Sequence, residues 1–323
     1  MLYFRQIMNG NNRLSFFVKG SAYSSKFLQN PSLYFSRMPD KPTNKIVAKF
    51  LRWETIANKA LYYAYEIARA RLTKRKYKIL FSLKAEREGD IKKSFRSLNH
   101  EIHFDEFTPE NFVKYDIIMP LNMPNLRRLI PHSDLVDNSI VPTPTMEAID
   151  ICDDKYLFYT TLVEKGFEND MPRVGKNLKI PYIVKRKVAH MGMDCYVIDT
   201  PEKEKAHWNE INHPDFFCQE IIPGKKEYAT HLIFRDGKMV CALNVVYIFS
   251  TSFYVKGVDK FIGNKLGKCP HLDLFADMLK SINFEGICCF NYKEIDGKPY
   301  VFEINPRFGG SLSMFFFSFL RQL

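Results

Sequence analysis

Three polar side chains able to bind a charged ligand lie two residues apart late in the chain. Glu303, Asn305 and Arg307 follow the apolar run 300–302. On a β-strand, residues i and i+2 point to the same face, so the three would share one ligand. A carboxylate beside an amide oxygen suits Mg²⁺, which takes further oxygens from nucleotide phosphates. The guanidinium is a planar fork for phosphate or carboxylate, so this spacing predicts phosphoryl-transfer chemistry.

The elements that must position these residues can be read from the apolar pattern of residues 146–323. The pattern predicts two hairpins, with turns at Arg235–Lys238 and Glu294–Gly297. The expected strands are Ile180–Lys185, Phe216–Ile222, Tyr228–Phe234, Met239–Val246, Gly286–Tyr292 and Pro299–Ile304. The expected helices are Met146–Lys165, Leu272–Ile282 and Leu312–Leu323.

An alternation of strands and a helix precedes this region. Strands are expected at Tyr77–Leu83, Glu101–Phe104 and Tyr115–Leu121, with a helix over Asp90–Asn99 after the first. Such alternation is typical of a small open α/β unit. Residues 1–45 carry many turn residues and little periodicity, and we expect them to be irregular.

The positive charge of the chain is concentrated at the N-terminus. Residues 1–76 hold 15 Lys and Arg against 3 Asp and Glu, whereas the whole chain carries +11. Residues 46–67 place an apolar stripe at helical spacing: Ile46, Phe50, Trp53, Ala57, Ala60, Leu61, Ala64 and Ile67. One interpretation is a helix that packs this stripe on the core and solvates its basic face. The alternative is association of residues 46–76 with an anionic membrane surface or an acidic polymer.

Composition excludes several classes of protein. In 323 residues, hydrophobic residues make up 46% and aromatic residues 15%, as in globular chains with a large core. No apolar run reaches the roughly 18 residues of a membrane-spanning helix. Seven scattered cysteines suggest reduced thiols and a cytoplasmic location, peripheral to the inner face of the membrane in the second interpretation. The histidines lack zinc spacing with the cysteines, so no zinc centre is expected. No Walker-type glycine loop is present, and no specific nucleic-acid partner is predicted.

Four segments in order resemble the ATP-grasp superfamily, most closely its carbamoyl phosphate synthetase-like branch. These are Pro144–Gly166, Ile180–Lys185, Gln219–Tyr228 and Gly286–Ser311. The resemblance implies an α/β and α+β protein, in which two α+β lobes clasp ATP after a small preATP-grasp-like α/β domain. The implied domains are 1–76, a basic extension, then 77–150, and then 151–323 with a lid subdomain at about 180–224.

The resemblance also assigns residues to roles. Lys155 and Lys185 would meet the ATP phosphates, Gly192 would belong to a phosphate lid and Glu227 would bind the ribose. The implied adenine hinge is Gln219, Glu220, Ile221 and Ile222. The implied ligands of Mg²⁺ or Mn²⁺ are Glu303, Asn305 and Asn291. The implied catalytic residues are Arg307 and Lys185. Asn291 stands where biotin carboxylases and D-alanine ligases have a carboxylate. We therefore expect the metal to bind mainly together with ATP.

The implied activity is ligation. A substrate carboxylate would be phosphorylated by ATP and then attacked by an amine or related nucleophile, which releases ADP and phosphate. Two alternatives remain open at this stage. The same scaffold can act as a kinase that stops at the phosphorylated small molecule or sugar, or the chain can be a non-catalytic protein that binds an acidic polymer. The sequence does not identify the carboxylate or the amine.

Overall fold

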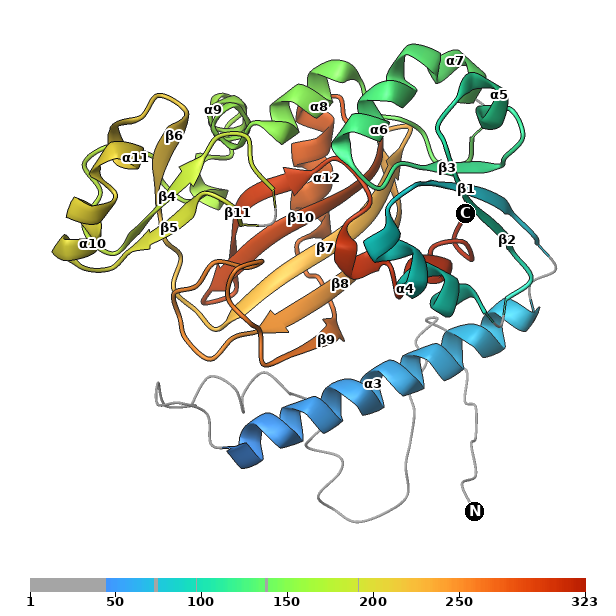
Figure 1. Ribbon diagram of the computed structural model, residues 1–323, viewed down its shortest axis with the longest axis horizontal. Helices are drawn as coiled ribbons and strands as arrows, with labels where there is room; N and C mark the ends of the chain where they lie inside the picture. Colours follow the sequence, from blue (N-terminus) through green and yellow to red (C-terminus); the bar gives the residue numbers. More distant parts are fainter. Residues whose placement is uncertain (1–44, 73–74, 97, 137–138, 191) are drawn as a thin grey trace. The chain divides into compact units, whose positions relative to one another are not determined.

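The computed structural model describes residues 45–72, 75–96, 98–136, 139–190 and 192–323, and among these it leaves out the side chains of 45–52 and 55. The expected irregular segment 1–45 therefore lies almost wholly outside the described residues. Three sheets organise the described part of the chain, with helices packed on them (Figure 1). The confirmed fold class is a mixed α/β and α+β arrangement.

The first sheet is small and parallel. Its strands are β1 (Lys78–Ser82), β2 (Glu101–Asp105) and β3 (Ile117–Met119), in the order β2-β1-β3. Helix α4 (Ala85–Phe95) connects β1 to β2 and begins five residues before the predicted Asp90. Short helices follow: α5 (Pro109–Phe112), α6 (Met123–Leu129) and α7 (Ser133–Val136). This confirms the open α/β unit that alternation in the sequence predicted.

The second sheet carries the hairpins. Its order is β11-β10-β7-β8-β9, for β7 (Lys226–Arg235), β8 (Lys238–Ile248), β9 (Gly263–Gly267), β10 (Gly286–Ile295) and β11 (Lys298–Asn305). Both predicted turns are present. In each, an Asp-Gly pair has positive φ, with 52° and 68° at Asp236 and Gly237. This is the backbone that two-residue hairpins require, and glycine adopts it without steric cost.

Both faces of this sheet are buried, so its central strands read as nearly continuous apolar runs. On one face, Cys288, Phe290 and Tyr292 of β10 pack against three helices, α8 (Met146–Asp153), α9 (Lys155–Glu164) and α12 (Leu272–Ser281). On the other face, Ile287 and Cys289 join the core of the first sheet. Successive strand residues alternate between faces, so Asn291 shares the second face with Cys289.

The third sheet is antiparallel and has the order β5-β4-β6, with β4 (Tyr182–Arg186), β5 (Cys195–Ile198) and β6 (Phe216–Glu220). Two short helices connect β5 to β6, α10 (Pro201–Ala206) and α11 (Trp208–Asn212). A small core of Tyr182, Val184, Ile198 and Cys218 holds this sheet together.

Two predicted helices differ from those observed. The expected helix 146–165 is two helices, because the side chain of Asp154 caps a new helix by accepting from the amides of Tyr156 and Leu157. The expected helix 312–323 is wrong: the segment forms 3₁₀ turns at Gly310–Leu312 and Phe316–Ser318. A helix built from these consecutive apolar residues would have no polar face to turn toward solvent. Phe315, Phe316, Phe317 and Phe319 are all buried, which a helix lying on a surface could not achieve.

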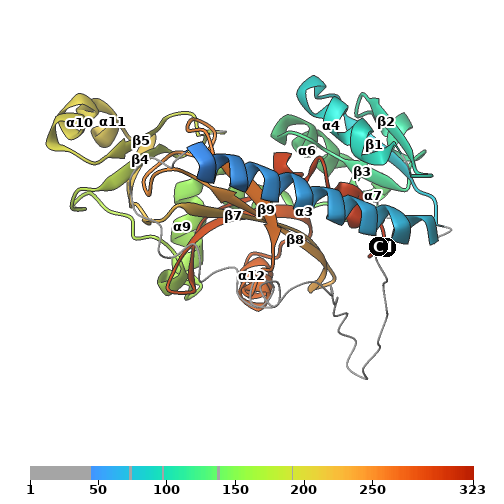
Figure 2. The same ribbon diagram turned by 90° about the horizontal axis from the view of Figure 1, so that it is seen from below.

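The N-terminal helix α3 (Lys45–Leu72) lies along β9 (Figures 1 and 2). The expectation that its apolar stripe packs on the core is wrong for the described side chains. Trp53 is 64% and Leu61 70% exposed, and Ala57, Ala60 and Ala64 are also exposed. The helix packs instead through Tyr62 and Tyr63, whose rings contact Phe315 and Phe317, and through buried Glu66, which pairs with Arg321.

All seven cysteines are free, in agreement with the predicted reduced thiols. Within the described residues, no helix has the length and apolar character needed to cross a membrane.

Candidate active site

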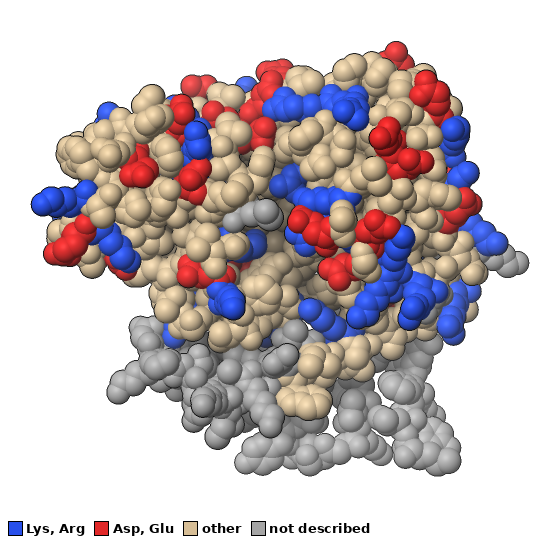
Figure 3. Space-filling view, in the orientation of Figure 1, with Lys and Arg blue, Asp and Glu red and all other residues tan. Residues whose placement is uncertain are grey.

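A cleft with a volume of about 930 Å³ brings together residues of the second and third sheets, of α3 and α4, and of the loops that follow β1 and β3. Figure 3 shows a hollow near the centre of the face it draws, with basic side chains at its edge. Every site residue that the sequence predicted lines this cleft. These residues span Lys155 to Arg307 in the chain, so tertiary structure and not sequence proximity joins them.

Strands β10 and β11 position the acidic centre of the cleft. Asn291 pairs directly with Glu303, and Cys289 pairs with Asn305, across the hairpin. A register shift after Asn291 marks a bulge, which places two residues of one strand against one of the other. The predicted i, i+2 arrangement therefore holds, and Glu303 and Asn305 share a face with Asn291.

Glu303 accepts hydrogen bonds from two amides at one of its oxygens. The Nδ2 atoms of Asn291 and Asn305 both donate to Oε1, the latter over 3.1 Å. Within the described part of the chain no side chain donates to Oε2. Burial alone would raise the pKa of Glu303, but the nearby charges of Lys155 and Lys185 outweigh it and lower the pKa. Glu303 is thus a partly buried carboxylate, ionised at neutral pH, with one oxygen left for a ligand.

Two lysines face this carboxylate from different elements. Lys185, on β4, donates to Gln219 Oε1 over 2.7 Å and lies 5.0 Å from the centre of the Phe302 ring. Burial lowers the pKa of Lys185. Lys155 is the first residue of α9, and its Nζ donates to the Ala189 carbonyl over 2.5 Å. Both ammonium groups are held at the cleft by contacts with neutral oxygens, which leaves their charge for an anion.

The expected hinge 219–222 forms one wall of the cleft. Gln219 and Glu220 end β6, and Glu220 pairs with Arg173 over 3.2 Å. Ile221 and Ile222 follow in extended chain, and within the described residues neither of their amides has a hydrogen-bond partner. The carbonyl of Ile222 accepts from Lys293 Nζ over 3.0 Å. Exposed backbone donors beside apolar side chains are suited to the polar edge of a flat ring.

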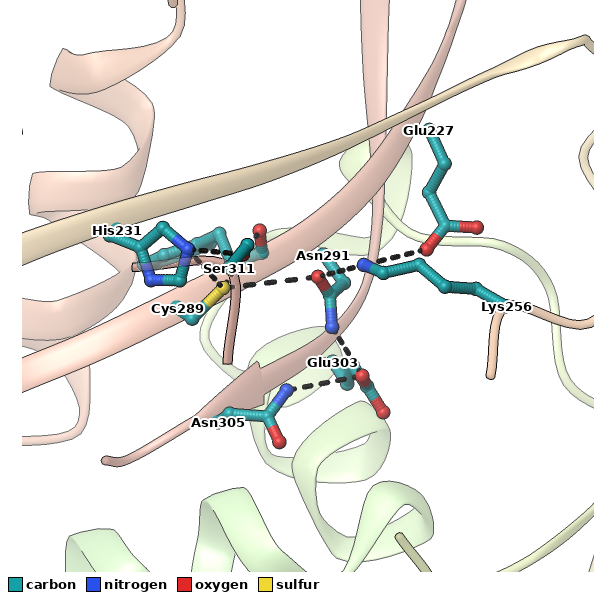
Figure 4. Close-up of polar contacts among 9 residues, drawn as sticks. Glu227, His231, Lys256, Cys289, Asn291, Glu303, Asn305 and Ser311 are labelled. Carbon is teal, nitrogen blue, oxygen red and sulfur yellow. Dashed lines mark hydrogen bonds and ion pairs between the residues drawn. The ribbon is translucent and has the colours of Figure 1, made fainter. Parts of the chain in front are cut away.

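Lys256 is a residue that sequence reasoning missed. Its Nζ lies 3.0 Å from Glu227 Oε1 and donates to Asn291 Oδ1 over 2.9 Å (Figure 4). Burial lowers the pKa of Lys256, but the charge of Glu227 more than offsets this, and the net pKa is raised. The loop Phe249–Lys260, which supplies Lys256, has no motif that would have marked it. Only the β7–β8–β9 topology brings the loop over the cleft.

Arg307 follows the carboxylate strand and is held by neutral groups. Its guanidinium donates to the backbone carbonyl of Phe308 over 3.3 Å and to the side-chain Oδ1 of Asn305 over 3.5 Å, and has no ion pair within 4 Å among the described residues. Burial lowers the pKa of Arg307, and Glu303 is the first charge that opposes the effect. A buried guanidinium with no carboxylate partner favours an anionic ligand.

The loop after Arg307 is tightly packed. A Cβ on Gly309 would lie 2.3 Å from the His231 ring, so only glycine fits there. His231 contacts Ser311 Oγ through Nε2 at 2.6 Å, and its Nδ1 has no partner among the described residues. Burial lowers the pKa of His231 to about 3, so the ring is neutral. An unpaired acceptor costs less than an unpaired donor, which favours Nε2–H donating to Ser311 and directs the Ser311 hydroxyl proton toward the cleft.

The structure also describes Gly192 of the predicted lid and the neighbouring cysteines Cys288 and Cys289 of β10. Gly192 has φ +74°, and a Cβ there would lie 2.6 Å from the Lys256 carbonyl, so this turn rests against the loop that carries Lys256. Residue 191, within the predicted lid, lies outside the described residues. Burial raises the pKa of Cys289 to about 12 and that of Cys288 further, which supports packing rather than a nucleophilic role.

The donor set fits a divalent cation bound together with a nucleotide. Glu303 supplies one carboxylate oxygen, and the Asn305 amide lies beside it. The Asn291 oxygen points to Lys256 and its nitrogen to Glu303, so Asn291 does not present an oxygen here. No group of three or more His, Cys, Asp or Glu side chains suited to a metal occurs in the described chain. One carboxylate supplies too few hard ligands for a free Mg²⁺, whereas phosphate oxygens would complete its shell.

This arrangement defines a class of protein, a two-lobed α+β domain whose cleft gathers several cations around the ionised Glu303. Residues 152–311 match the family described as ATP-grasp domain. Residues 152–311 thus belong to the ATP-grasp superfamily, as the resemblance implied. None of the curated protein sequences matches it.

Solved structures agree on the fold. Phosphoribosylamine–glycine ligase from Thermotoga maritima is 15% identical, with a TM-score of 0.55, and the alignment covers 74% of this chain and 71% of that one. L-amino acid ligase from Bacillus licheniformis is 13% identical, with a TM-score of 0.50 and coverage of 76% and 70%. N5-carboxyaminoimidazole synthase from Aspergillus clavatus, in complex with ADP and 5-aminoimidazole ribonucleotide, is 11% identical, with a TM-score of 0.50 and coverage of 72% and 71%.

Proposed function

We propose that this protein is an ATP-dependent ligase that activates a carboxylate as an acyl phosphate and joins it to an amine. The observation that carries the proposal is the cluster around Glu303. A partly buried, ionised carboxylate faces two lysines and a guanidinium without an ion pair among the described residues, all in one cleft. Such a cluster fits the triphosphate of a nucleotide beside a second substrate, and the named ligases share the fold.

The residue roles follow from their surroundings. Lys155 and Lys185 would neutralise phosphate charge that shifts during transfer, in a site with little water. The amides of Ile221 and Ile222 would receive the adenine edge. Glu303 and Asn305 would hold Mg²⁺ or Mn²⁺ with the phosphates, which supplies Lewis-acid polarisation of a phosphoryl oxygen when bound. Arg307 would orient the carboxylate and stabilise charge on the acyl phosphate.

Two of the expected roles change in form. Because Glu227 is ion-paired with Lys256, it would meet the ribose hydroxyls only through its remaining oxygen. Asn291 orients Glu303 and Lys256 in this structure, so a ligand role would require its amide to turn over. The lid around Gly192 would exclude water from the activated acyl group.

The test is ADP release by purified protein with Mg-ATP and a panel of carboxylates and amines. Glu303→Gln keeps the shape and removes the charge, and we expect turnover to fall about 10³-fold while nucleotide-free stability is unchanged. Lys185→Met should also reduce turnover, by about 10²-fold. Wild-type turnover in Glu303→Gln would reject the assignment. A stable phosphorylated product that forms without an amine would identify a kinase instead.

We propose in addition that α3 docks the protein on an anionic lipid surface. Trp53, Ile56, Leu61 and Leu72 are large, apolar and exposed on this helix, and the helix ends in basic residues. The exposed apolar side chains favour lipid over an acidic polymer, because a polymer would leave them in water.

A further inference from the structure

The cleft extends past Arg307 to a second group of basic side chains, on α3 and α4. This basic wall consists of Lys59, Lys84 and Arg87. None of the three lies in residues 152–311, the segment that matches the ATP-grasp domain family. A ligand that contacts the basic wall therefore touches α3 and the start of α4, outside the residues that match this family.

Arg87 lies directly over the loop that follows Arg307. A Cβ on Gly310 would come within 2.5 Å of Arg87 Nη2. The nearest carboxylate to Arg87 is that of Glu86, at 4.0 Å, and Glu86 is half exposed. Arg87 is also one of the charges that lower the pKa of Arg307, after burial. Two guanidinium groups that repel each other across a cleft are stabilised when an anion binds between them.

Lys59 and Lys84 extend this basic surface. Burial lowers the pKa of Lys59, and Asp90 on α4 opposes the shift. Lys84 donates to the Leu121 carbonyl over 3.5 Å and pairs with Glu86 over 3.2 Å. The four cations Lys59, Lys84, Arg87 and Arg307 face two carboxylates, Asp90 and the half-exposed Glu86, so positive charge is in excess here.

We propose that the basic wall is the subsite for the distal end of the acid substrate, and that this substrate carries at least one further anionic group beyond the reacting carboxylate. The inference rests on the proposed function, which assigns the reacting carboxylate to Arg307. A monocarboxylate held by Arg307 would leave excess positive charge at the basic wall, whose three cations face the two carboxylates Glu86 and Asp90. The further group is a carboxylate or a phosphate, since both match a guanidinium in geometry.

The experiment measures binding by calorimetry in the presence of magnesium and a non-hydrolysable ATP analogue. Tricarballylate probes a polycarboxylate, 3-phosphoglycerate probes a phosphorylated acid, and butyrate is the monocarboxylate comparison. We expect saturable binding of at least one polyanion, and at least tenfold weaker binding of butyrate. Arg87→Gln and Lys59→Gln should each weaken polyanion binding about tenfold, the size of a lost charge-assisted hydrogen bond. Arg87→Lys should retain more affinity than Arg87→Gln.

The matched control is Lys92→Gln, on the same helix α4, because Lys92 is exposed and pairs with Glu88 away from the cleft. It removes the same charge and should leave polyanion affinity unchanged. Equal affinities for butyrate and the polyanions, no binding of either polyanion, or equal weakening by Lys92→Gln would each overturn the inference. Nucleotide affinity, titrated separately, distinguishes the two proposals: its absence in the wild type rejects the proposed function, whereas Arg87-dependent polyanion binding would still support the subsite.

Discussion

Glu227 and Lys256 form an ion pair at the edge of the nucleotide lobe, and Glu227 is only 5% exposed. Removing one member of such a pair leaves the other charge desolvated. Removing both costs far less, because no charge remains buried. The Asn291 oxygen also loses its donor when Lys256 is replaced.

We expect Lys256→Met to destabilise the protein by about 3 kcal/mol, the usual cost of stranding a buried charge. Urea unfolding measures this change. The double variant Lys256→Met/Glu227→Gln should recover at least half of the loss. If the single variant unfolds at the wild-type urea concentration, the pair does not contribute to the fold as described.

Among individual site residues, those on or next to strands were predicted from the sequence, and Lys256 in the loop was missed. Glu303 and Asn305 could be found because strand periodicity puts them on one face, and Arg307, which lies just beyond the end of β11, was found from the same spacing. Lys256 and Arg87 could not, because each reaches the cleft through a contact between elements far apart in the chain. His231 was likewise missed, since its environment depends on Gly309, almost 80 residues later.

The hinge after β6 is coupled to strand β10 through a lysine. Lys293 donates to the carbonyls of Ile222 and Ser252, and its Nζ lies 3.9 Å from the centre of the Tyr254 ring. Burial lowers the pKa of Lys293 to about 8, and the charge of Glu227 opposes this shift. The side chain is therefore protonated below pH 8 and loses its charge above it.

A nucleotide is an anion, so loss of this positive charge should weaken its binding. We expect the dissociation constant for Mg-ATP to rise several-fold between pH 7 and pH 9, with a midpoint near pH 8. Lys293→Met should bind more weakly at pH 7 and show no such rise. Titrations of both proteins with a fluorescent ATP analogue at several pH values provide the measurement. A rise of the same size in Lys293→Met would assign the titration to another group.

Elements with regular patterns were predicted well, and those governed by local capping or by burial on all sides were not. The two Asp-Gly hairpins are confirmed because the turn chemistry is local. The break at Asp154 was missed, since an acidic cap inside a helical pattern looks like a surface residue. The C-terminal segment was wrongly predicted as a helix. Its seven consecutive residues 314–320 are all buried or partly buried, so their burial has no periodicity that distinguishes a helix from other structures.

For the whole molecule, the exposed stripe of α3 is the largest departure from expectation. The stripe and its spacing are visible in the sequence, but which face a helix buries depends on the surface available to it. Here Tyr62 and Tyr63 pack against the aromatic C-terminal segment, so the opposite face of α3 is exposed to solvent.

We expect the protein to co-sediment with vesicles that contain phosphatidylserine, and binding should weaken with added salt. Trp53→Ser/Leu61→Ser should reduce the bound fraction at least tenfold, because each side chain contributes apolar area to the lipid interface. Val113→Ser, at another exposed apolar residue, is the control. Absence of wild-type binding to these vesicles at low salt would reject the lipid proposal.

The contacts of residues 315–320 have a consequence for synthesis on the ribosome. Phe316 packs against Phe81 of β1 and Phe95 of α4, more than 200 residues earlier in the chain. The parallel sheet, although translated early, cannot complete its interior until translation has passed residue 320. During elongation its apolar side chains remain accessible to chaperones and to other nascent chains. Shortening the chain by even these few residues should therefore lower the yield of native protein more than it disturbs the distant nucleotide lobes.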